Sequence, residues 1–284
     1  MRVDQGDGLS ERDLRAAFAD GRFELHYQPQ HASRDNALVG VEALVRLRMP
    51  DGSLVSPDCF IAQVEQTGLV HELGLSLFEL GCMQAARWPS LTVAINVSPI
   101  QFKDAALPAR LARIAARAAV DPSRMEIEIT EGLFFEDPDR AEVALHALHD
   151  AGFGIALDDF GTGFSSLGYL LRFPVNKIKI DRSFVRGLPD DMKSASIIHA
   201  LVALGRALGL KIVAEGVETE GQRQFLRVAG CHLLQGYLFS GAVSQEDITA
   251  QLRAGAVASI GCPPNGVGRP DPMLAPLKSQ RAGG

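Results

Sequence analysis

Short apolar runs alternate with longer amphipathic stretches over most of the chain. The amphipathic stretches predict helices near 69–87, 104–119, 139–151, 190–208 and 219–229. Nearly continuous apolar runs separated by helices are typical of βα units in a parallel sheet, and six or more units favour a closed barrel over an open sheet. The runs read LTVAIN (91–96), MEIEIT (125–130), FGIALDD (153–159), NKIKID (176–181), KIVAEG (211–216) and, more weakly, CHLLQG (231–236).

The amino-terminal part departs from this repeat. Ser10 is suited to cap a helix that ends at Gly21. The segment RFELHYQ (22–28) alternates like a strand, a turn-rich ASRDN (32–36) follows, and ALVGVEALVRL (37–47) predicts a second strand. This hairpin-like pair indicates that one strand of the barrel runs antiparallel to its neighbours.

The two ends of the chain differ in character from the middle. Residues 1–8 are expected to form a flexible leader, and residues 9–254 a single folded domain. Residues 255–284 are expected to form a disordered tail, because ten of the last 24 residues are Gly or Pro and no apolar period is present.

Composition narrows the class of protein. Hydrophobic residues make up 46% and charged residues 22%, which is ordinary for a globular protein, and the net charge of −6 argues against a nucleic-acid polymer as partner. Four widely spaced cysteines without a CxxC pair predict reduced thiols rather than zinc ligands or disulfides. The polar amino terminus lacks a signal-peptide core, and the apolar segment 194–205 is too short to span a bilayer. We therefore expect a cytoplasmic protein.

Polar side chains recur where the predicted strands end. In a barrel the carboxyl ends of parallel strands share one rim, so these side chains are expected to surround one pocket. They are Glu42, Asn96, Glu128, Asp158, Asp159, Lys179, Asp181, Glu215 and Gln235, with Glu131 and Glu218 shortly after two of the strands.

Each of these residues, taken alone, also has an ordinary structural explanation that involves no active site. A single carboxylate at a strand end is usually a helix cap or a solvated loop residue, and Lys179 could be an exposed edge lysine. Recurrence on six strands weakens that interpretation, because converging carboxylates repel one another unless cations compensate. Mg²⁺ and Mn²⁺ prefer oxygen ligands, and a pair of ions about 3.5–4 Å apart is the usual clamp for phosphodiester hydrolysis. We expect Asp158 to bridge two such ions and Asp159 to serve one of them.

The glycine-rich GTGFSS (161–166) directly follows the two aspartates. It could be a phosphate-binding turn, but it lacks the third glycine of a dinucleotide fingerprint, and the acidic pair would repel a pyrophosphate. A mobile loop over the site agrees better with the sequence, because Gly161 and Gly163 permit hinge torsions.

An ordered set of motifs resembles the EAL domain, a bacterial family of cyclic di-GMP phosphodiesterases. The resemblance covers roughly residues 10–253. Its motifs are YQP (27–29), EALVR (42–46), NVS (96–98), EIEITE (126–131), DDFGTGFSSL (158–167), KIKID (177–181), AEGVE (214–218) and QGYLF (235–239).

The resemblance implies a TIM-like (β/α)8 barrel whose first strand is antiparallel. It implies that one Mg²⁺ or Mn²⁺ is held by Glu42, Asn96, Glu128 and Asp158, and a second by Asp158 and Asp159 with support from Glu215. Lys179 would hold the attacking water, Asp181 would orient that lysine, and Gln235 would bond within the water or substrate shell. Gln28, Arg46 and Glu218 would contact the dinucleotide, and Glu131 would anchor the GTGFSS loop.

The activity so implied is hydrolysis of cyclic di-GMP to linear 5′-pGpG, and the family leads us to expect a homodimer. Regulation through an unidentified partner, through dimerisation or only through substrate level is left open. The alternative is a non-catalytic cyclic di-GMP receptor or protein-interaction module, since some members of the family have lost the metal acids. A metal hydrolase for another phosphodiester also agrees with the residue chemistry. One departure from the family is Ala242, where a proline is usual, and it bears on affinity more than on chemistry.

Overall fold

A computed structural model describes residues 9–161 and 167–260, with only the backbone described at residues 135, 136, 167 and 255–260. The expected leader (1–8), most of the GTGFSS loop (162–166) and residues 261–284 of the expected tail lie outside the described residues. Residues 255–260 differ from the expected tail, because they continue a helix. The sequence of this stretch, GAVASI (255–260), contains no proline that would end the helix earlier.

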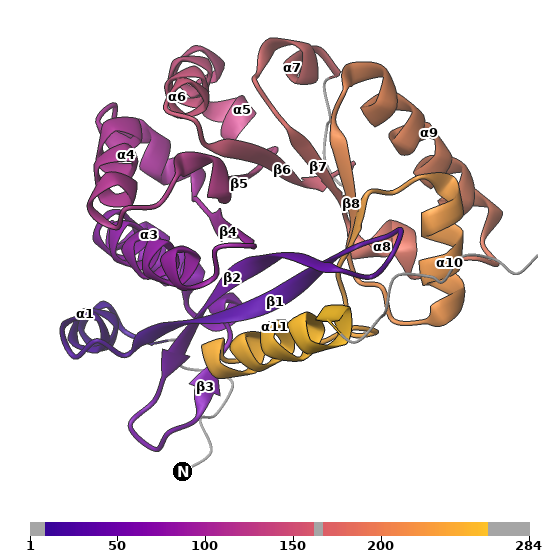
Figure 1. Ribbon diagram of the computed structural model, residues 1–284. Helices are drawn as coiled ribbons and strands as arrows, with labels where there is room; N and C mark the ends of the chain where they lie inside the picture. The colour runs from indigo at the N-terminus through magenta and orange to yellow at the C-terminus, as the bar shows by residue number, and fades with distance from the viewer. Residues whose placement is uncertain (1–8, 162–166, 261–284) are drawn as a thin grey trace, which may run out of the picture.

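Eight strands close into a ring (Figure 1). Around the ring the order is β1, β9, β8, β7, β6, β5, β4 and β2, and β2 pairs back to β1. The strands are β1 (Phe23–Ala32), β2 (Leu38–Arg48), β4 (Thr92–Asn96), β5 (Met125–Thr130), β6 (Gly154–Phe160), β7 (Lys177–Ile180), β8 (Lys211–Ala214) and β9 (Leu233–Leu234). The short β3 (Leu54–Val55) pairs with β2 outside the ring.

The direction of β1 sets this barrel apart from a regular one. It pairs antiparallel with both β2 and β9, whereas the other neighbours in the ring pair in parallel. The predicted TIM-like barrel with an antiparallel first strand is therefore confirmed.

Alternation along the strands separates an apolar outer layer from a polar interior. On β5, Met125, Ile127 and Ile129 belong to the apolar core. The intervening Glu126 and Glu128 face the lysines of β7 across the barrel. Because side chains alternate between the two faces of a strand, the apolar set meets the helices and the charged set fills the barrel.

The helices surround the ring (Figure 1). The predicted helices are confirmed to within a few residues at each end. The helices are α1 (Glu11–Ala19), α2 (Ile61–Gln66), α3 (Val70–Arg87), α4 (Leu107–Arg117), α5 (Leu133–Glu136), α6 (Pro138–Asp150), α7 (Leu167–Arg172), α8 (Arg182–Val185), α9 (Met192–Leu208), α10 (Glu220–Ala229) and α11 (Gln245–Ile260).

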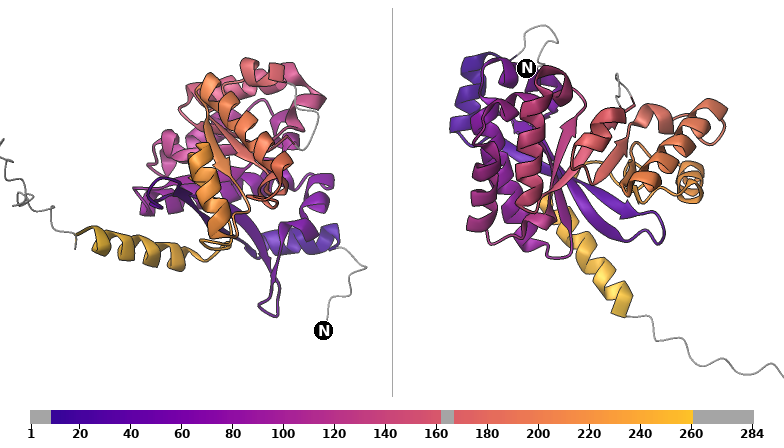
Figure 2. Two further views of the ribbon diagram at one scale, coloured as in Figure 1. Left: turned by 90° about the vertical axis from the view of Figure 1, so that its right-hand side faces the viewer. Right: turned by 90° about the horizontal axis from the view of Figure 1, so that it is seen from above.

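The ends of the folded domain are held by specific contacts. Ser10 caps α1 through a capping box with Asp13, as the sequence predicts. At the other end, α11 projects from the barrel (Figure 2), and its first turns are anchored by the buried Ile248 and by a 3.0 Å hydrogen bond from the Trp88 indole to the Thr249 hydroxyl.

No helix in the described part of the chain is long and apolar enough to cross a membrane. Cys59, Cys82 and Cys231, the three cysteines that the structure describes, are free thiols.

Candidate active site

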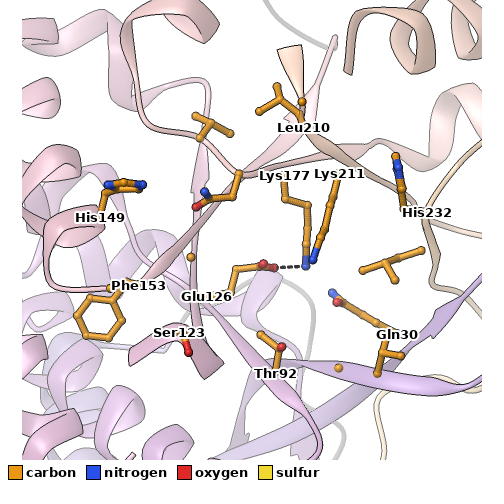
Figure 3. Close-up of a pocket in the computed structure, with 18 of the residues that line it drawn as sticks. Gln30, Thr92, Ser123, Glu126, His149, Phe153, Lys177, Leu210, Lys211 and His232 are labelled. Atoms are coloured by element: carbon orange, nitrogen blue, oxygen red, sulfur yellow. Dashed lines mark hydrogen bonds and ion pairs between the residues drawn. The ribbon is translucent and has the colours of Figure 1, made fainter. Parts of the chain in front are cut away.

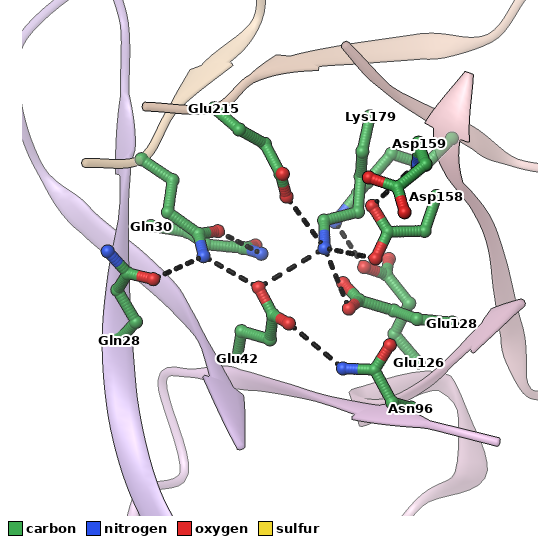
Figure 4. Close-up of polar contacts among 12 residues, drawn as sticks. Gln28, Gln30, Glu42, Asn96, Glu126, Glu128, Asp158, Asp159, Lys179 and Glu215 are labelled. Atoms are coloured by element: carbon green, nitrogen blue, oxygen red, sulfur yellow. Dashed lines mark hydrogen bonds and ion pairs between the residues drawn. The ribbon is translucent and has the colours of Figure 1, made fainter. Parts of the chain in front are cut away.

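A cluster of acidic and amide side chains lies inside the barrel, toward the carboxyl ends of its parallel strands (Figure 4). Each strand of the ring contributes, so barrel closure brings together residues that are far apart in sequence. The contributors are Gln28 from β1, Glu42 from β2, Asn96 from β4, Glu128 from β5, Asp158 and Asp159 from β6, Lys179 from β7, and Glu215 and Gln235 just after β8 and β9.

The ammonium group of Lys179 lies at the centre of this cluster and is only 1% exposed. Its Nζ is 3.1 Å from Glu42 Oε2, 2.8 Å from Glu128 Oε2, 3.1 Å from Asp158 Oδ2 and 2.7 Å from Glu215 Oε1. Burial lowers the pKa of Lys179, but the four carboxylates outweigh it and raise that pKa well above its ordinary value. Lys179 is therefore a charged hydrogen-bond donor and not a base, and it is not an edge lysine.

Glu42 is the most fully hydrogen-bonded carboxylate of the cluster. Its Oε1 accepts from Asn96 Nδ2 at 2.9 Å, and its Oε2 accepts from Gln235 Nε2 at 2.6 Å as well as from Lys179. Burial raises its pKa, yet the Lys179 charge and these donors together lower the pKa below the ordinary value. Glu42 is thus held as a carboxylate.

The pKa of Glu128 is shifted in the opposite direction from that of Glu42. Its side chain is fully buried, and its Oε1 has no hydrogen-bond partner among the described residues. Burial, and then the negative charge of Glu42, raise the pKa of Glu128 well above its ordinary value. An unpaired buried carboxylate oxygen is costly, and it marks a place where a cation would bind favourably.

Asp158, Asp159 and Glu215 form a second carboxylate group beside the first. Oxygen atoms of these three residues lie within 4.8 Å of one another, and the same is true of Glu42, Glu128 and Asp158. Burial and then the charge of Asp158 raise the pKa of Asp159. Burial, with the charges of Asp158 and Glu42 acting against the opposing effect of Lys179, raises the pKa of Glu215 to about 8.

Asp158 belongs to both groups, as expected of a bridging ligand. The turn that follows it is unusual, since Asp159 has φ +53° and Gly161 has φ +94°. A left-handed conformation is uncommon for a residue other than glycine, so the surrounding structure must hold Asp159 in it. It turns the Asp159 carboxyl away from the course of β6, so that two consecutive residues can both face the cluster.

The donor set suits hard divalent cations. Around the one ammonium of Lys179 lie four carboxylates, so the cluster has more negative than positive charge when ionised. Among the described residues of the cluster, the possible ligands are carboxylate and amide oxygens, without histidine or cysteine, and such oxygen sets are typical of hard divalent cations. The unpaired Oε1 of Glu128 agrees with the same conclusion.

Gly236 explains how Gln235 reaches the cluster. A Cβ on Gly236 would lie 2.2 Å from the Val217 backbone nitrogen, so the two chain segments can approach this closely only with glycine at this position. The backbone of Gln235 is bonded on both sides of this approach, to Ala214 and Val217. Its amide consequently points inward from the end of β9.

Glu131 lies where a loop anchor is expected. Its Oε1 accepts the backbone N–H of Gly161 at 3.0 Å, which ties the end of β5 to the turn that carries Asp159. This contact holds the first residue of the GTGFSS segment in place, next to the second carboxylate group.

Three predicted residues do not join the cluster directly. Asp181 caps α8 by accepting the Ser183 backbone N–H at 3.0 Å, and the structure shows no contact between Asp181 and Lys179. Arg46 donates to the carbonyl of Val45 at 2.8 Å. Glu218 is exposed at the rim. The proposed roles of these three residues remain predictions.

The sequence analysis missed two buried polar features of the barrel interior. Gln30, 2% exposed, donates to Gln235 Oε1 at 3.0 Å. Lys177 and Glu126 form a buried ion pair at 2.6 Å, one layer below the cluster. The period-2 spacing of Gln28 with Gln30, Glu126 with Glu128 and Lys177 with Lys179 was the available signal, because it places each pair on one face of its strand.

Two cavities open on the barrel interior from opposite ends. One, of about 430 Å³, combines Asn96, Glu128, Asp158 and Asp159 with an apolar wall that includes Ile61. It can receive a ligand with both a charged and an apolar part. The other, of about 780 Å³, lies at the amino ends of the strands, where the Lys177–Glu126 pair closes off the cluster above (Figure 3).

Comparison with known proteins agrees with this architecture. The family model described as "EAL domain" matches residues 11–242. The bifunctional diguanylate cyclase/cyclic di-GMP phosphodiesterase MucR of Pseudomonas aeruginosa is 40% identical over 245 residues, which are 84% of this chain and 36% of MucR. The cyclic di-GMP phosphodiesterase NbdA of the same organism is 37% identical over 249 residues, which are 86% of this chain and 32% of NbdA. The chain thus spans about a third of the length of these relatives.

Solved structures extend the similarity to three dimensions. The MucR phosphodiesterase in complex with c-di-GMP superposes with a TM-score of 0.79 at 40% identity, covering 84% of this chain and 98% of that one. The EAL enzyme Bd1971 with cAMP and cyclic di-GMP bound gives a TM-score of 0.81 at 30% identity, covering 85% of this chain and 68% of that one. With its antiparallel first strand, its acidic cluster and a family match over most of its length, the chain belongs to the EAL domain family.

Proposed function

We propose that this chain hydrolyses one 3′–5′ phosphodiester bond of cyclic di-GMP and releases linear 5′-pGpG, with two divalent cations, Mg²⁺ or Mn²⁺. The observation that carries the proposal is the pair of carboxylate groups joined at Asp158, since it provides two neighbouring sets of oxygen ligands. Relatives named cyclic di-GMP phosphodiesterases and a relative solved with c-di-GMP support the choice of substrate.

Glu42, Asn96, Glu128 and Asp158 would hold one ion, and Asp158, Asp159 and Glu215 the other. Divalent cations in such a site make a bound water acidic and neutralise charge on the phosphoryl oxygens.

The protein groups have separate tasks. Lys179 stays protonated, so it can donate a hydrogen bond that orients the attacking water or the phosphoryl group. Glu215, whose pKa is raised to about 8 in the metal-free site, is mostly protonated near neutral pH and would release this proton when a cation binds. Gln235 and Gln28 are linked by a 3.0 Å hydrogen bond and would present amides to the dinucleotide. Arg46 and Glu218 would contact the dinucleotide, and a role of Asp181 in orienting Lys179 stays a prediction.

The apolar wall beside the acids gives a purine base a place to bind. Ile61 and Val64 of α2 and Leu77 of α3 line the cavity that also contains Asp158 and Asp159. A dinucleotide could thus place one base on this wall while a phosphate lies over the acids. A homodimer, expected from the family resemblance, a regulatory partner, and a cytoplasmic location, expected from the composition, are further parts of the proposal.

The decisive experiment incubates the purified chain with cyclic di-GMP and Mg²⁺ or Mn²⁺, with and without a chelator, and separates the products by chromatography. We expect 5′-pGpG only with free divalent cation, and slower turnover of cyclic di-AMP. Saturable binding of intact cyclic di-GMP without product would favour a receptor instead. Equal turnover of other phosphodiesters would favour a hydrolase of broader specificity.

A further inference from the structure

Gln30 lies at the floor of the proposed active site, outside the set of residues that could contact metal or substrate. It is two residues beyond Gln28 on β1, on the same inward face. Because β1 runs against its neighbours, Gln30 lies one layer closer to the amino ends of the parallel strands, where it also lines the 780 Å³ cavity (Figure 3). Its side chain is nevertheless 2% exposed.

The hydrogen bonds around Gln235 can be oriented in one way only. Glu42 Oε2 accepts from Lys179 and lies 2.6 Å from a Gln235 amide atom, so Gln235 must present its NH2 group to Glu42. The same NH2 group reaches Gln28 Oε1 at 3.0 Å. The carbonyl oxygen of Gln235 must then face Gln30, at 3.0 Å, and Gln30 must be the donor.

Space around Gln30 is limited on its far side. A Cβ on Gly40 would lie 3.3 Å from Gln30 Oε1 and 3.2 Å from the Thr92 carbonyl oxygen, tighter than an ordinary contact. Gly40 pairs with Gln30 across the β1–β2 ladder. The ladder and the Thr92 backbone therefore restrict Gln30, which can act as a rigid donor.

We propose that Gln30 is a positioning residue that fixes the amide orientation of Gln235, and through it the placement of Glu42 and Gln28. This inference rests on the proposed function, because Glu42 is there a metal ligand and Gln28 a substrate contact. Without the donor at position 30, the Gln235 amide can rotate, and Glu42 then loses one of its donors. Residues that orient metal ligands typically affect metal affinity by about 10-fold or more.

The test compares Gln30→Met, which removes the donor at similar length, with Gln30→Glu, which keeps the shape but offers only acceptors. Thr92→Val is the matched control, since Thr92 lines the same cavity without a side-chain bond to the cluster. Titration calorimetry with Mn²⁺ on the full chain measures metal affinity, steady-state kinetics gives KM and kcat, and thermal unfolding verifies that each variant folds.

We expect both Gln30 variants to bind Mn²⁺ about 10-fold more weakly, with Gln30→Glu the worse of the two, and Thr92→Val to match the unsubstituted chain. KM for cyclic di-GMP should rise more than kcat falls, because Gln28 loses its partner. In a Gln235→Met background, Gln30→Met should have no further effect on Mn²⁺ affinity, since it acts through Gln235.

Mn²⁺ affinity within about twofold of the unsubstituted chain for both variants, or additive losses in the Gln235→Met background, would overturn the inference. If the unsubstituted chain binds Mn²⁺ but does not hydrolyse cyclic di-GMP, the proposed activity fails, and the affinity series still decides the role of Gln30. Absence of Mn²⁺ binding by the unsubstituted chain would overturn both.

Discussion

Replacement of Lys179 by methionine should destabilise the metal-free protein far more than loss of an ordinary surface charge. The ammonium group contacts four carboxylates at 2.7–3.1 Å and is 1% exposed, so its removal leaves buried negative charges without a counter-charge. Breaking a buried ion pair by removing one partner typically costs about 3–5 kcal/mol. For a domain of this size, that corresponds to a fall in Tm of about 10 °C.

The assay is urea or thermal unfolding at neutral pH in the presence of a chelator, repeated with saturating Mn²⁺ in place of the chelator. A ligand that binds only the folded state stabilises it by about 2.7 kcal/mol at a concentration 100 times its Kd. Mn²⁺ should therefore recover a large part of the loss in Lys179→Met, because the cation takes over the charge compensation.

Lys177→Met is the matched control. Lys177 lies two residues earlier on β7, is also buried (5% exposed) and forms a 2.6 Å ion pair with Glu126. Glu126 belongs to neither of the carboxylate groups found among the described residues. Removal of Lys177 should destabilise the protein to a similar degree, but Mn²⁺ should recover no more than in the unsubstituted chain. A loss below about 1 kcal/mol for Lys179→Met, or equal recovery of both variants, would refute this account of the cluster.

Three further outcomes follow from the same contacts. Since the folded-state pKa of Glu215 is raised to about 8, stability of the metal-free protein should fall as pH rises from about 4.5 to about 8. Urea midpoints across this range should show a flatter dependence for Glu215→Gln, and an identical slope would contradict the raised pKa. Asp158→Asn should reduce phosphodiesterase activity by more than about 100-fold even in excess Mg²⁺, because replacing a residue that only orients a metal ligand already costs up to about that much. Undiminished turnover would exclude the two-ion arrangement. Glu131→Ala removes the acceptor for the Gly161 N–H and should raise the Mn²⁺ concentration for half-maximal activity about 10-fold at little cost in Tm, whereas an unchanged half-maximal concentration would show that the loop needs no anchor.

The sequence by itself determined the type of fold and the composition of the site. Alternation of short apolar runs with amphipathic stretches specified βα units, and the hairpin near the start indicated the antiparallel first strand. Polar residues at the ends of the predicted strands indicated that one pocket lies at the carboxyl-terminal rim of the barrel. These features are local, because helix and strand periodicity depend on residues within a few positions of one another.

Only the tertiary structure decided which of these residues meet. Asp181, expected beside Lys179, instead caps α8, since a backbone N–H two residues on lies within its reach. Asp159 reaches the cluster only through a left-handed turn that the apolar run before it does not predict. Gln30 and Gln235 are 205 positions apart, and their bond exists because barrel closure pairs β1 with β9. The partners of a buried polar group depend on strand register and barrel closure, and these are set by packing across the whole molecule and not by any local pattern.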